Sequence, residues 1–588
     1  MKKTKNCGGG VKKSKIALVA GVVLSAGLAL TGCGVNNNSQ NENQSQSENQ
    51  ETSYSIAYDL NGGTGIENTN YVLENDSVTL PTNVTRAGYV FDGWYLDGSE
   101  VVSISKNMFK NLNKTSLTIE AKWYDTFTYE NNSRTTLTGL TTYASDVTEV
   151  VIPKSVKTID SKAFYGNTKL KKVTFEEGSQ LTKIGEKSFY RCSALETIEV
   201  PDTVTSVKSG AFYDCSSLSY NSDKTVCADY LGNNENPYLI LVKPRTRTSI
   251  YCIINEECKV ICDYAFYGCS DLIEVSIPAS VTNIGHRAFD GCNRLIAVTN
   301  MSDLDITAGS TDNGYVGCYA KFIHKSLNVE AKYEESNGVS YYIYNGEKIA
   351  VCAYKLSGTT LTLDSDCTSI NQYAFSSPST FDICSDLTSI TIPSGVTSIG
   401  GGAFEGCSKL ETVTFKDGSQ LTSIGGSAFY YCSSLTSITI PSGVTSIGVF
   451  AFSCCSSLSS INIPKSVTSI GEVAFSGCSS LTLITIPSGV ISIGDGTFYG
   501  CSSLTSITIP ANVTSIGDTV FDDCSNLTSV YYLGSADEWS SIGIGSNNTS
   551  LTNATKYYYS ETEPTDTTNK YWHYDSDGNI VVWTKSIT

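Results

Sequence analysis

The chain has 588 residues, of which 40% are hydrophobic, and its 58 acidic residues outnumber its 40 basic ones, for a formal net charge of -18. The apolar content is sufficient for a folded protein with a substantial core. The acidic balance argues against nucleic acid as a partner, because nucleic-acid-binding proteins use clustered Lys and Arg to neutralise phosphates.

The first 33 residues resemble a bacterial lipoprotein signal peptide. Six lysines and no acid precede residue 16, a short apolar run covers residues 16–30, and Leu30-Thr31-Gly32-Cys33 follows. The run is shorter than a typical membrane span, and the residues on either side of it are those of an export signal. The resemblance implies that Cys33 receives a diacylglycerol and anchors the exported chain at the extracytoplasmic surface of a bacterial envelope. A plain secretory signal is the alternative.

Residues 34–53 contain only one apolar side chain and cannot bury enough surface to offset the entropy of ordering. They are interpreted as a flexible tether. Removing the six lysines of the leader brings the formal net charge of the remaining chain to about -24, a value that favours solubility.

Residues 54–125 show short alternating strands separated by Asn-Gly, Gly-Gly and Asp-Gly turns, which are typical of hairpins. The segments YSIAYDLNGGT, AGYVFDGWYLDGSEV and SLTIEAKW resemble the internalin-type B repeat, a small β-grasp-like module of bacterial surface proteins. Trp94 and Trp123 are read as core residues of this module and not as a sugar-stacking pair, because so small a domain needs large aromatic side chains inside.

A repeat of about 23 residues dominates the rest of the chain and predicts a mainly β solenoid. In LTSITIP at residues 435–441, Ile438 and Ile440 share the inward face of a strand and the proline ends it. Val444 and Ile447 repeat the inward spacing, and Gly448 turns the chain. Each coil carries one phenylalanine, at positions 164, 189, 212, 266, 289, 375, 404, 429, 452, 475, 498 and 521.

Ten cysteines stand three residues after these phenylalanines: Cys192, Cys215, Cys269, Cys292, Cys407, Cys432, Cys455, Cys478, Cys501 and Cys524. One cysteine per coil does not converge on a point, so a metal site is not predicted. The column is interpreted as small side chains that fill a tight, buried corner. Cys252 and Cys258, with Cys262 and Cys269, are read as irregular core cysteines and not as a metal knot. So many unpaired thiols in an exported protein suggest a reducing habitat.

The unit C-x-x-L-x-x-I-x-I-P-x-x-V-x-x-I-G-x-x-A-F is similar to that of the BspA-like leucine-rich repeat surface proteins. The resemblance implies a cell-surface adhesin that binds host matrix or plasma proteins, such as fibronectin and fibrinogen, or surface glycans or other bacteria. The rival interpretation is an envelope spacer or a polysaccharide-capturing lipoprotein without a specific site. The expected organisation is a leader (1–33), a tether (34–53), the B repeat (54–125), repeats (136–218, 261–300 and 371–530), two irregular inserts (219–260 and 301–370), and a C-terminal cap with a hairpin tail (531–588).

No catalytic constellation is visible in the sequence. The only histidines are His286, His324 and His573, none has a neighbouring motif, and no nucleophile elbow, zinc-protease helix or phosphate-binding loop occurs. We therefore expect no enzymatic activity, no cofactor and no metal.

A binding surface is predicted on the outward face of the stacked strands, where a polar, uncharged row of side chains runs along the array. The alternative is that threonine simply suits an exposed strand. Tyrosines follow the repeat phenylalanine at positions 165, 190, 213, 267, 430 and 499. They either form a second, exposed contact stripe or shield the edges of the coils. The residues of the predicted row are Thr414, Thr439, Asn462, Thr485 and Thr508.

Overall fold

The structure is a computed structural model, and it describes residues 52–67, 70–222, 228–326, 330–353, 358–376, 384–565 and 568–584. The leader, the lipidation site Cys33 and all but the last two residues of the tether lie outside the described residues. Within them, no helix has the length and apolar character needed to cross a membrane.

The N-terminal module is a five-stranded sheet with one helix, in the order β2-β1-β7-β4-β5. Trp94 is 3% exposed within its core, and the indole of half-buried Trp123 donates to the carbonyl of Leu60. A Cβ at Gly63 would lie 2.5 Å from the Trp123 ring, so only glycine fits there. The elements are β1 (Ser55–Asp59), β2 (Asn70–Val72), β3 (Ser77–Thr79), β4 (Tyr89–Leu96), β5 (Ser99–Val101), β6 (Ser103–Ser105), α1 (Lys106–Leu112) and β7 (Ser116–Asp125).

The module rests directly on the first coil of the solenoid. The amide of Gly88 donates to the carbonyl of Val151 at 3.1 Å. Arg134 holds Asp125 through one guanidinium nitrogen at 2.6 Å and donates to the hydroxyl of Tyr89 at 2.7 Å. The first strands of the second unit are β8 (Phe127–Tyr129) and β9 (Thr136–Leu140).

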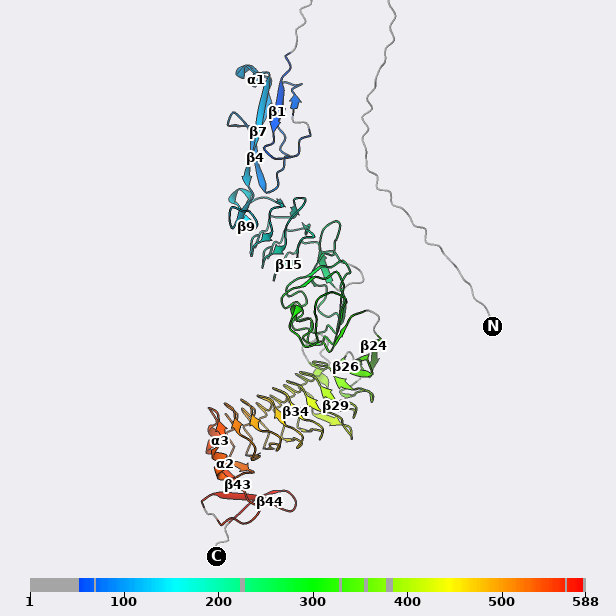
Figure 1. Cartoon of the computed structure of the whole chain (residues 1–588), viewed down its shortest axis with the longest axis vertical. Coiled ribbons are helices and arrows are strands. Elements are labelled where there is room, and N and C mark those ends of the chain that lie inside the picture. Colours follow the sequence, from blue (N-terminus) through cyan, green and yellow to red (C-terminus); the bar gives the residue numbers. More distant parts are fainter. Residues whose placement is uncertain are drawn as a thin grey trace, which may run out of the picture.

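From residue 127 the chain winds into coils, and each regular coil contributes one strand to each of two faces on which strands of adjacent coils pair in parallel, which confirms the predicted β-solenoid (Figure 1). The pairing is interrupted, so each face consists of four hydrogen-bonded sheets in series. The first face, here called the outer sheet, carries the I-x-I strands. Its members are β10 (Glu149–Ile152), β12 (Lys172–Phe175), β14 (Thr197–Ile198), β18 (Tyr251–Ile253), β20 (Glu274–Ile277), β22 (Ala297–Asn300), β23 (Phe322–His324), β27 (Thr360–Thr362), β29 (Ser389–Ile392), β31 (Thr412–Phe415), β33 (Ser437–Thr439), β35 (Ser460–Asn462), β37 (Leu483–Thr485), β39 (Ser506–Ile509) and β41 (Ser529–Tyr532).

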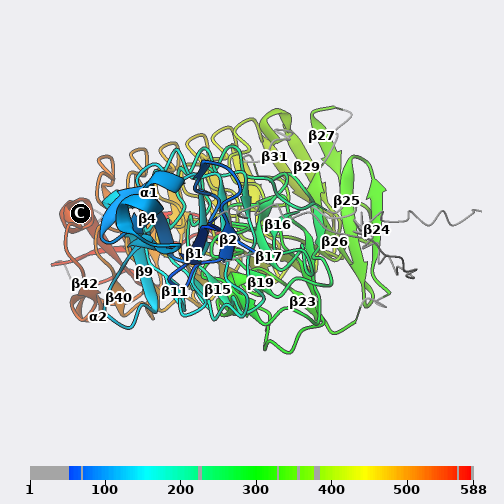
Figure 2. The ribbon, with the colours of Figure 1, turned by 90° about the horizontal axis from the view of Figure 1, so that it is seen from above.

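The second face, here called the short-strand sheet, is built mostly from two-residue strands; in the last block these are Ser-Ile pairs in register, such as Ser446 with Ser469 and Ile447 with Ile470. Seen from above, the loops of successive coils form a regular row along one edge (Figure 2). Its members after β9 are β11 (Thr158–Ile159), β13 (Lys183–Ile184), β15 (Ser206–Val207), β16 (Ala228–Leu231), β17 (Ile240–Pro244), β19 (Val260–Ile261), β21 (Asn283–Ile284), β24 (Lys332–Ser336), β25 (Val339–Tyr344), β26 (Glu347–Ala353), β28 (Ser369–Ile370), β30 (Ser398–Ile399), β32 (Ser423–Ile424), β34 (Ser446–Ile447), β36 (Ser469–Ile470), β38 (Ser492–Ile493), β40 (Ser515–Ile516) and β42 (Gly543–Ile544).

The two segments that break the sequence period form elaborated coils of the same solenoid. In the first, β16 and β17 make an antiparallel pair, and β17 continues the short-strand sheet by pairing with β19. In the second, β24, β25 and β26 form an antiparallel meander that leads into β28. The array that starts at β27 runs in a different direction from the earlier coils (Figure 1).

The C-terminal cap covers the last coil. Strand β43 (Thr555–Tyr559) pairs with β41, β44 (Lys570–Tyr574) pairs with β43, and β44 forms an antiparallel hairpin with β45 (Ile580–Val582). Two short helices, α2 (Ala536–Ser540) and α3 (Thr549–Asn553), flank β42. The helix α2 begins with a capping box made by Ser535 and Glu538.

Candidate ligand-binding surfaces

The cysteine column lies inside the corner of the coils, next to the stacked phenylalanines. All ten column cysteines lie outside any disulfide and are at most 6% exposed. Phenylalanines of adjacent coils stack with ring centroids 4.8–5.6 Å apart. Nine of the ten thiols donate to the carbonyl of the phenylalanine of the preceding coil, with Sγ to oxygen distances of 3.0–3.3 Å. The column is therefore both packing material and a ladder of hydrogen bonds.

The four cysteines around the first insert do not form a ligand set. Cys252 is disulfide-bonded, which corrects its reading as an irregular core thiol, whereas Cys258, Cys262 and Cys269 are buried free thiols. Burial raises the pKa of Cys258 to about 12. A thiol that resists ionisation is a poor metal ligand, since the thiolate is the form that binds. The part of the chain that the structure describes contains no group of three or more His, Cys, Asp or Glu side chains able to hold a metal ion.

The three histidines lie in separate environments. His286 is exposed beside Tyr264, and His573 stacks on Trp583 with ring centroids 4.1 Å apart. His324 is buried, its Nε2 lies 3.0 Å from the hydroxyl of Tyr342, and burial lowers its pKa. The three rings are thus held by different neighbours, and none of these contacts joins one histidine to another.

The predicted polar row is mostly where the sequence places it, on the outward face of the outer sheet. Thr414, Thr439, Asn462 and Thr485 are exposed, and Thr439 pairs in register with Asn462. Thr508 departs from the prediction because it is only 2% exposed. Its neighbour in register on the next strand is Tyr531, whose ring packs against Trp572 of the cap. The bulky aromatic side chains of the cap thus replace the small polar ones and cover this end of the row.

A hollow of about 430 Å³ opens in the same face between β31 and β33. These strands share only one pair in register, Thr412 with Ser437, because the two extra residues of the Lys416 to Ser419 turn let the strands diverge. Thr414, Thr439 and Lys416 line the hollow, together with Ser442. The structure therefore brings two of the five predicted residues into one concave site, and Asn462 and Thr485 continue the exposed row beyond it.

The tyrosines after the repeat phenylalanine form a stack in the first block of coils. Tyr165, Tyr190 and Tyr213 stack face to face with ring centroids 5.1 and 5.2 Å apart, which is the spacing of the coils. Tyr213 is the last of the three rings and is 63% exposed. Within the described residues its ring contacts only that of Tyr190, so its other face is open.

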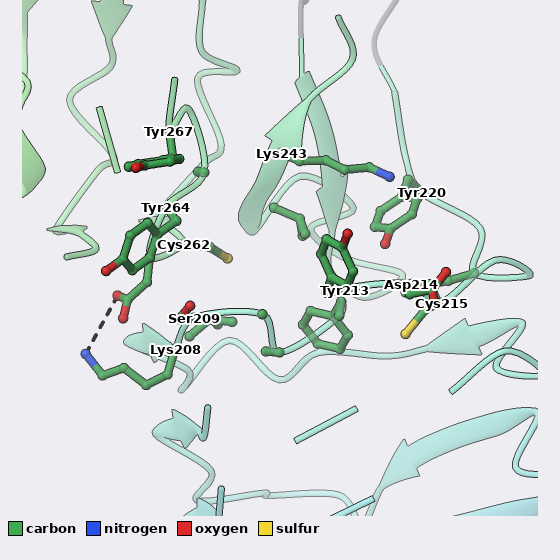
Figure 3. A pocket seen from close by; sticks show the side chains of 18 of the residues that line it. Lys208, Ser209, Tyr213, Asp214, Cys215, Tyr220, Lys243, Cys262, Tyr264 and Tyr267 are labelled. Atoms are coloured by element: carbon green, nitrogen blue, oxygen red, sulfur yellow. Dashed lines mark ion pairs between the residues drawn. The ribbon is translucent and has the colours of Figure 1, made fainter. Parts of the chain in front are cut away.

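A larger cleft of about 750 Å³ lies beyond Tyr213, where the first block of coils meets the first elaborated coil. Figure 3 shows Tyr213 projecting between Tyr264 and Tyr267 on one side and Tyr220 and Lys243 on the other. The end of β17 and the loop after it supply Lys243 and Arg247, and the next coil supplies Asp263. The cleft is thus walled by aromatic rings from two blocks of the solenoid.

Charged side chains surround these rings. Lys208 pairs with Asp263 at 3.7 Å, as the dashed line in Figure 3 marks, and the ammonium of Lys243 lies 4.4 Å from the centre of the Tyr220 ring. Arg247 donates to the carbonyl of Tyr267 at 3.2 Å. Burial raises the pKa of the Tyr220 phenol above its usual range and that of Cys215 to about 11, so both groups stay neutral at physiological pH.

Sequence reasoning identified Tyr213 and Tyr267 as surface tyrosines but not the cleft between them. Lys243 and Arg247 follow a strand whose register cannot be derived from a repeat unit, because the insert does not obey the period. The available signal was the short basic run VKPRTR at residues 242–247, which holds three cationic side chains within five positions.

The family comparisons agree with the repeat pattern. Residues 140–224, 247–310 and 349–555 match the profile of the BspA type leucine rich repeat region, and residues 54–122 match that of the Listeria-Bacteroides repeat domain. A search of curated proteins returned no match.

Solved structures similar to the chain include three bacterial leucine-rich repeat proteins. One from Bacteroides ovatus is 24% identical, with a TM-score of 0.35, and the match covers 74% of this chain and 97% of that one. A leucine rich cell surface protein from Faecalibacterium prausnitzii is 25% identical, with a TM-score of 0.27 and coverage of 68% and 82%. A leucine rich repeat protein from T. pallidum is 30% identical over 33% of this chain and 91% of its own, with a TM-score of 0.30. Since the repeat profile matches more than half of the residues, the chain belongs to the BspA-type leucine-rich repeat family.

Proposed function

We propose that the chain is a lipid-anchored binding protein of the bacterial surface, whose solenoid holds extracellular protein or glycan ligands and carries out no catalysis. Matrix proteins, plasma proteins and surface glycans are the ligand classes. Lipidation at Cys33 would fix the chain to the membrane, and the segment 34–53 would separate the solenoid from the lipid surface. The family assignment and the leader sequence support this proposal.

The observation that carries the proposal is the exposed polar row on the outer sheet with its hollow. Thr414, Thr439, Asn462 and Thr485 are solvent-exposed on strands whose inward side chains are buried or, at Ile461, half-buried. Such a face presents hydroxyl and amide groups at regular spacing on a rigid support, and little side-chain entropy is lost when a ligand orders them. The hollow beside Lys416 provides a concave point of attachment on an otherwise flat face.

The test is a binding screen with residues 34–588 immobilised, against a panel of matrix proteins, plasma proteins and glycans. Saturable retention of one ligand is expected, and Thr439→Lys with Thr485→Lys should abolish it. The matched control is Val449→Lys with Ile491→Lys, which adds the same two charges to the same two coils. Val449 and Ile491 are 44% and 61% exposed but flank the short-strand sheet.

The screen separates three interpretations. Loss of binding in the threonine pair and not in the control pair supports the outer sheet as the binding face. Equal loss in both pairs would show a general charge effect and contradict a site on that face. No retention across the panel would favour an envelope spacer without a ligand.

A further inference from the structure

We infer that the cleft between Tyr213 and Tyr267 binds a segment of an acidic glycan, a chain of sugars that carry carboxylates. The inference rests on the proposed function in one respect, namely that the solenoid is displayed where extracellular glycans are present. It assigns the ligand to a site distinct from the outer sheet.

The cleft exists because the two coils at this junction are hydrogen-bonded to each other at the short-strand sheet but not at the corner. At the short-strand sheet the coils remain in contact, since the amide of Asp263 donates to the carbonyl of Val207 at 3.2 Å. At the corner, regular coils are linked by bonds such as Arg191 to the carbonyl of Tyr213, at 2.9 Å. Among the described residues, no backbone hydrogen bond joins the corner 209–215 to the corner 264–268. A wedge therefore opens where the next stacked tyrosine would otherwise lie.

The two aromatic walls provide flat apolar surfaces that are not used by the fold. Tyr213 ends the three-ring stack, and Tyr267, which is 46% exposed, makes a ring contact only with Tyr264 within the described residues. A pyranose ring presents C–H bonds on its face, and these pack favourably against the negative face of an aromatic ring. The volume of about 750 Å³ is in the range of sites that hold a small oligosaccharide, which is roughly 300–1,000 Å³.

The charged side chains that line the cleft favour an acidic sugar over a neutral one. Lys208, Lys243 and Arg247 line the cleft, against Asp214 and Asp263. Asp214 is engaged by Arg191 at 3.5 Å and Asp263 by Lys208 and by the amide of His286, while Lys243 is itself paired with Asp229 at 3.8 Å. Arg247 has no ion pair among the described residues, and its guanidinium is suited to bidentate contact with a carboxylate. A cationic cleft on a chain of net charge -18 is a local reversal that favours an anionic ligand.

The experiment uses residues 34–588 and measures binding of a hexasaccharide of galacturonic acid by calorimetry. The matched ligand is the same oligosaccharide with its carboxylates methyl-esterified. Binding of the acid and weak or absent binding of the ester is the expected result. Affinity should fall as salt rises from about 50 to about 500 mM, because the ion pairs are exposed to screening.

Two variants and two controls locate the site. Arg247→Gln and Tyr213→Ala should each weaken binding about tenfold or more. Arg245→Gln makes the same charge change in the same loop, and Arg245 does not line the cleft, so its affinity should stay within about twofold. Tyr165→Ala removes the ring at the other end of the stack and should also leave binding unchanged, so it controls for loss of stacking as such.

Each remaining outcome overturns the inference. Equal affinity for acid and ester would remove the role of the carboxylate. Loss with Arg247→Gln and none with Tyr213→Ala would reduce the site to a simple anion site without a sugar. Binding that is lost with Thr439→Lys and Thr485→Lys but kept in both cleft variants would place the glycan on the outer sheet. That result would overturn the cleft and leave the proposed function standing.

Discussion

The thiol of Cys478 donates a hydrogen bond to the carbonyl oxygen of Phe452, 3.2 Å away on the preceding coil. Both residues are fully buried. The same carbonyl also accepts from the amide of Cys455 at 3.2 Å, so the thiol supplies a second hydrogen bond to one buried oxygen. Alanine at this position would remove that second bond and part of the packing of the corner.

The buried thiols make the fold sensitive to alkaline pH. Burial raises the pKa of Cys192 and of Cys524 to about 12, whereas an unfolded thiol ionises near 8.5–9. Above pH 9 the unfolded chain loses protons that the folded chain keeps, so the stability is complete below pH 8 and falls as the pH rises toward 12. Each such thiol contributes a loss of about 1.4 kcal/mol per pH unit in this window. The urea midpoint, measured at pH 8 and at pH 10, should therefore fall steeply.

The variant Cys192→Ala tests the assignment of this effect to the thiols. It should be less stable than the parent at pH 7 by roughly 1 kcal/mol, because it loses a hydrogen bond. Between pH 8 and pH 10, the free energy of unfolding of the variant should fall less than that of the parent. The difference should equal the contribution of one thiol. An identical pH dependence in parent and variant would contradict the assignment.

Adjacent cysteines should differ sharply in reactivity. Cys455 is fully buried, and burial raises its pKa above the usual range, whereas Cys454 is half-buried at the surface of the same corner. Because the thiolate is the reactive form, iodoacetamide should modify Cys454 in the folded protein and Cys455 only after unfolding. Mass spectrometry of the peptide that contains both should show one adduct before denaturation and two after it. The variant Cys454→Ser should show none in the folded state, and an adduct there would disprove the burial of Cys455.

A buried arginine of the second block of coils pairs with an aspartate of its own block and bonds to backbone carbonyls of the third. Arg294 lies 2.9 Å from Asp271, both side chains are at most 7% exposed, and Arg294 also donates to the carbonyls of Tyr373 and Ser376. Arg294→Ala would leave a buried carboxylate and two carbonyls without this partner, so we expect a loss of roughly 3–5 kcal/mol. The exposed pair of Lys409 and Asp386, at 2.7 Å, is the control, and Lys409→Ala should cost less than about 1 kcal/mol. Thermal unfolding of both variants is the measurement, and equal shifts would show that the junction does not depend on Arg294.

The repeat could be predicted from the sequence because apolar residues recur at its inward positions in nearly every coil. Ile438, Ile440, Val444 and Ile447 are all buried as the pattern requires. The junctions could not be predicted, since Arg294 bonds to the carbonyls of Tyr373 and Ser376, 79 and 82 positions away, through contacts that do not follow the repeat period. The same limit applies to the candidate sites. The outward row follows from strand alternation, but the burial of Thr508 depends on how the cap folds back, and the cleft depends on where the coils separate.

Gly448 shows a different kind of limit. The sequence suggests that it turns the chain, but its requirement comes from contact between coils. A Cβ at Gly448 would lie 2.4 Å from the backbone nitrogen of Gly426, and one at Gly471 would meet Val449 in the same way. Glycine is thus needed because the backbones of adjacent coils approach each other closely, which a single unit cannot show.

The close approach predicts different effects at two consecutive positions of the repeat unit, represented here by Gly448 and, in another coil, by Gly401. Gly448→Ala should lower the free energy of unfolding by roughly 1–3 kcal/mol, because the backbone must shift to admit the methyl group. Gly401→Ala is the control, since its Cβ would meet only one carbonyl oxygen, at 3.3 Å, and the corresponding positions of other coils hold Glu472 and Asp495. Its effect should stay within about 0.5 kcal/mol. Denaturant midpoints of the two variants are the measurement, and equal shifts would contradict the close contact at Gly448.

Two residues before each repeat phenylalanine, the backbone adopts a left-handed conformation whatever the side chain. Gly402 and Gly496 have φ of 59° and 58°, and Val473 has the same φ of 58°. A β-branched residue is strained in this conformation by roughly 1–2 kcal/mol. Glycine removes the strain but loses more backbone entropy on folding, so only part of that free energy is gained. Val473→Gly should therefore stabilise the protein by roughly 0.5–1 kcal/mol, measured as a higher urea midpoint. Val449→Gly is the matched control, because Val449 is not among the residues with positive φ, and it should destabilise the protein by a similar amount. If both substitutions lowered the midpoint equally, the left-handed strain at Val473 would not be the cause.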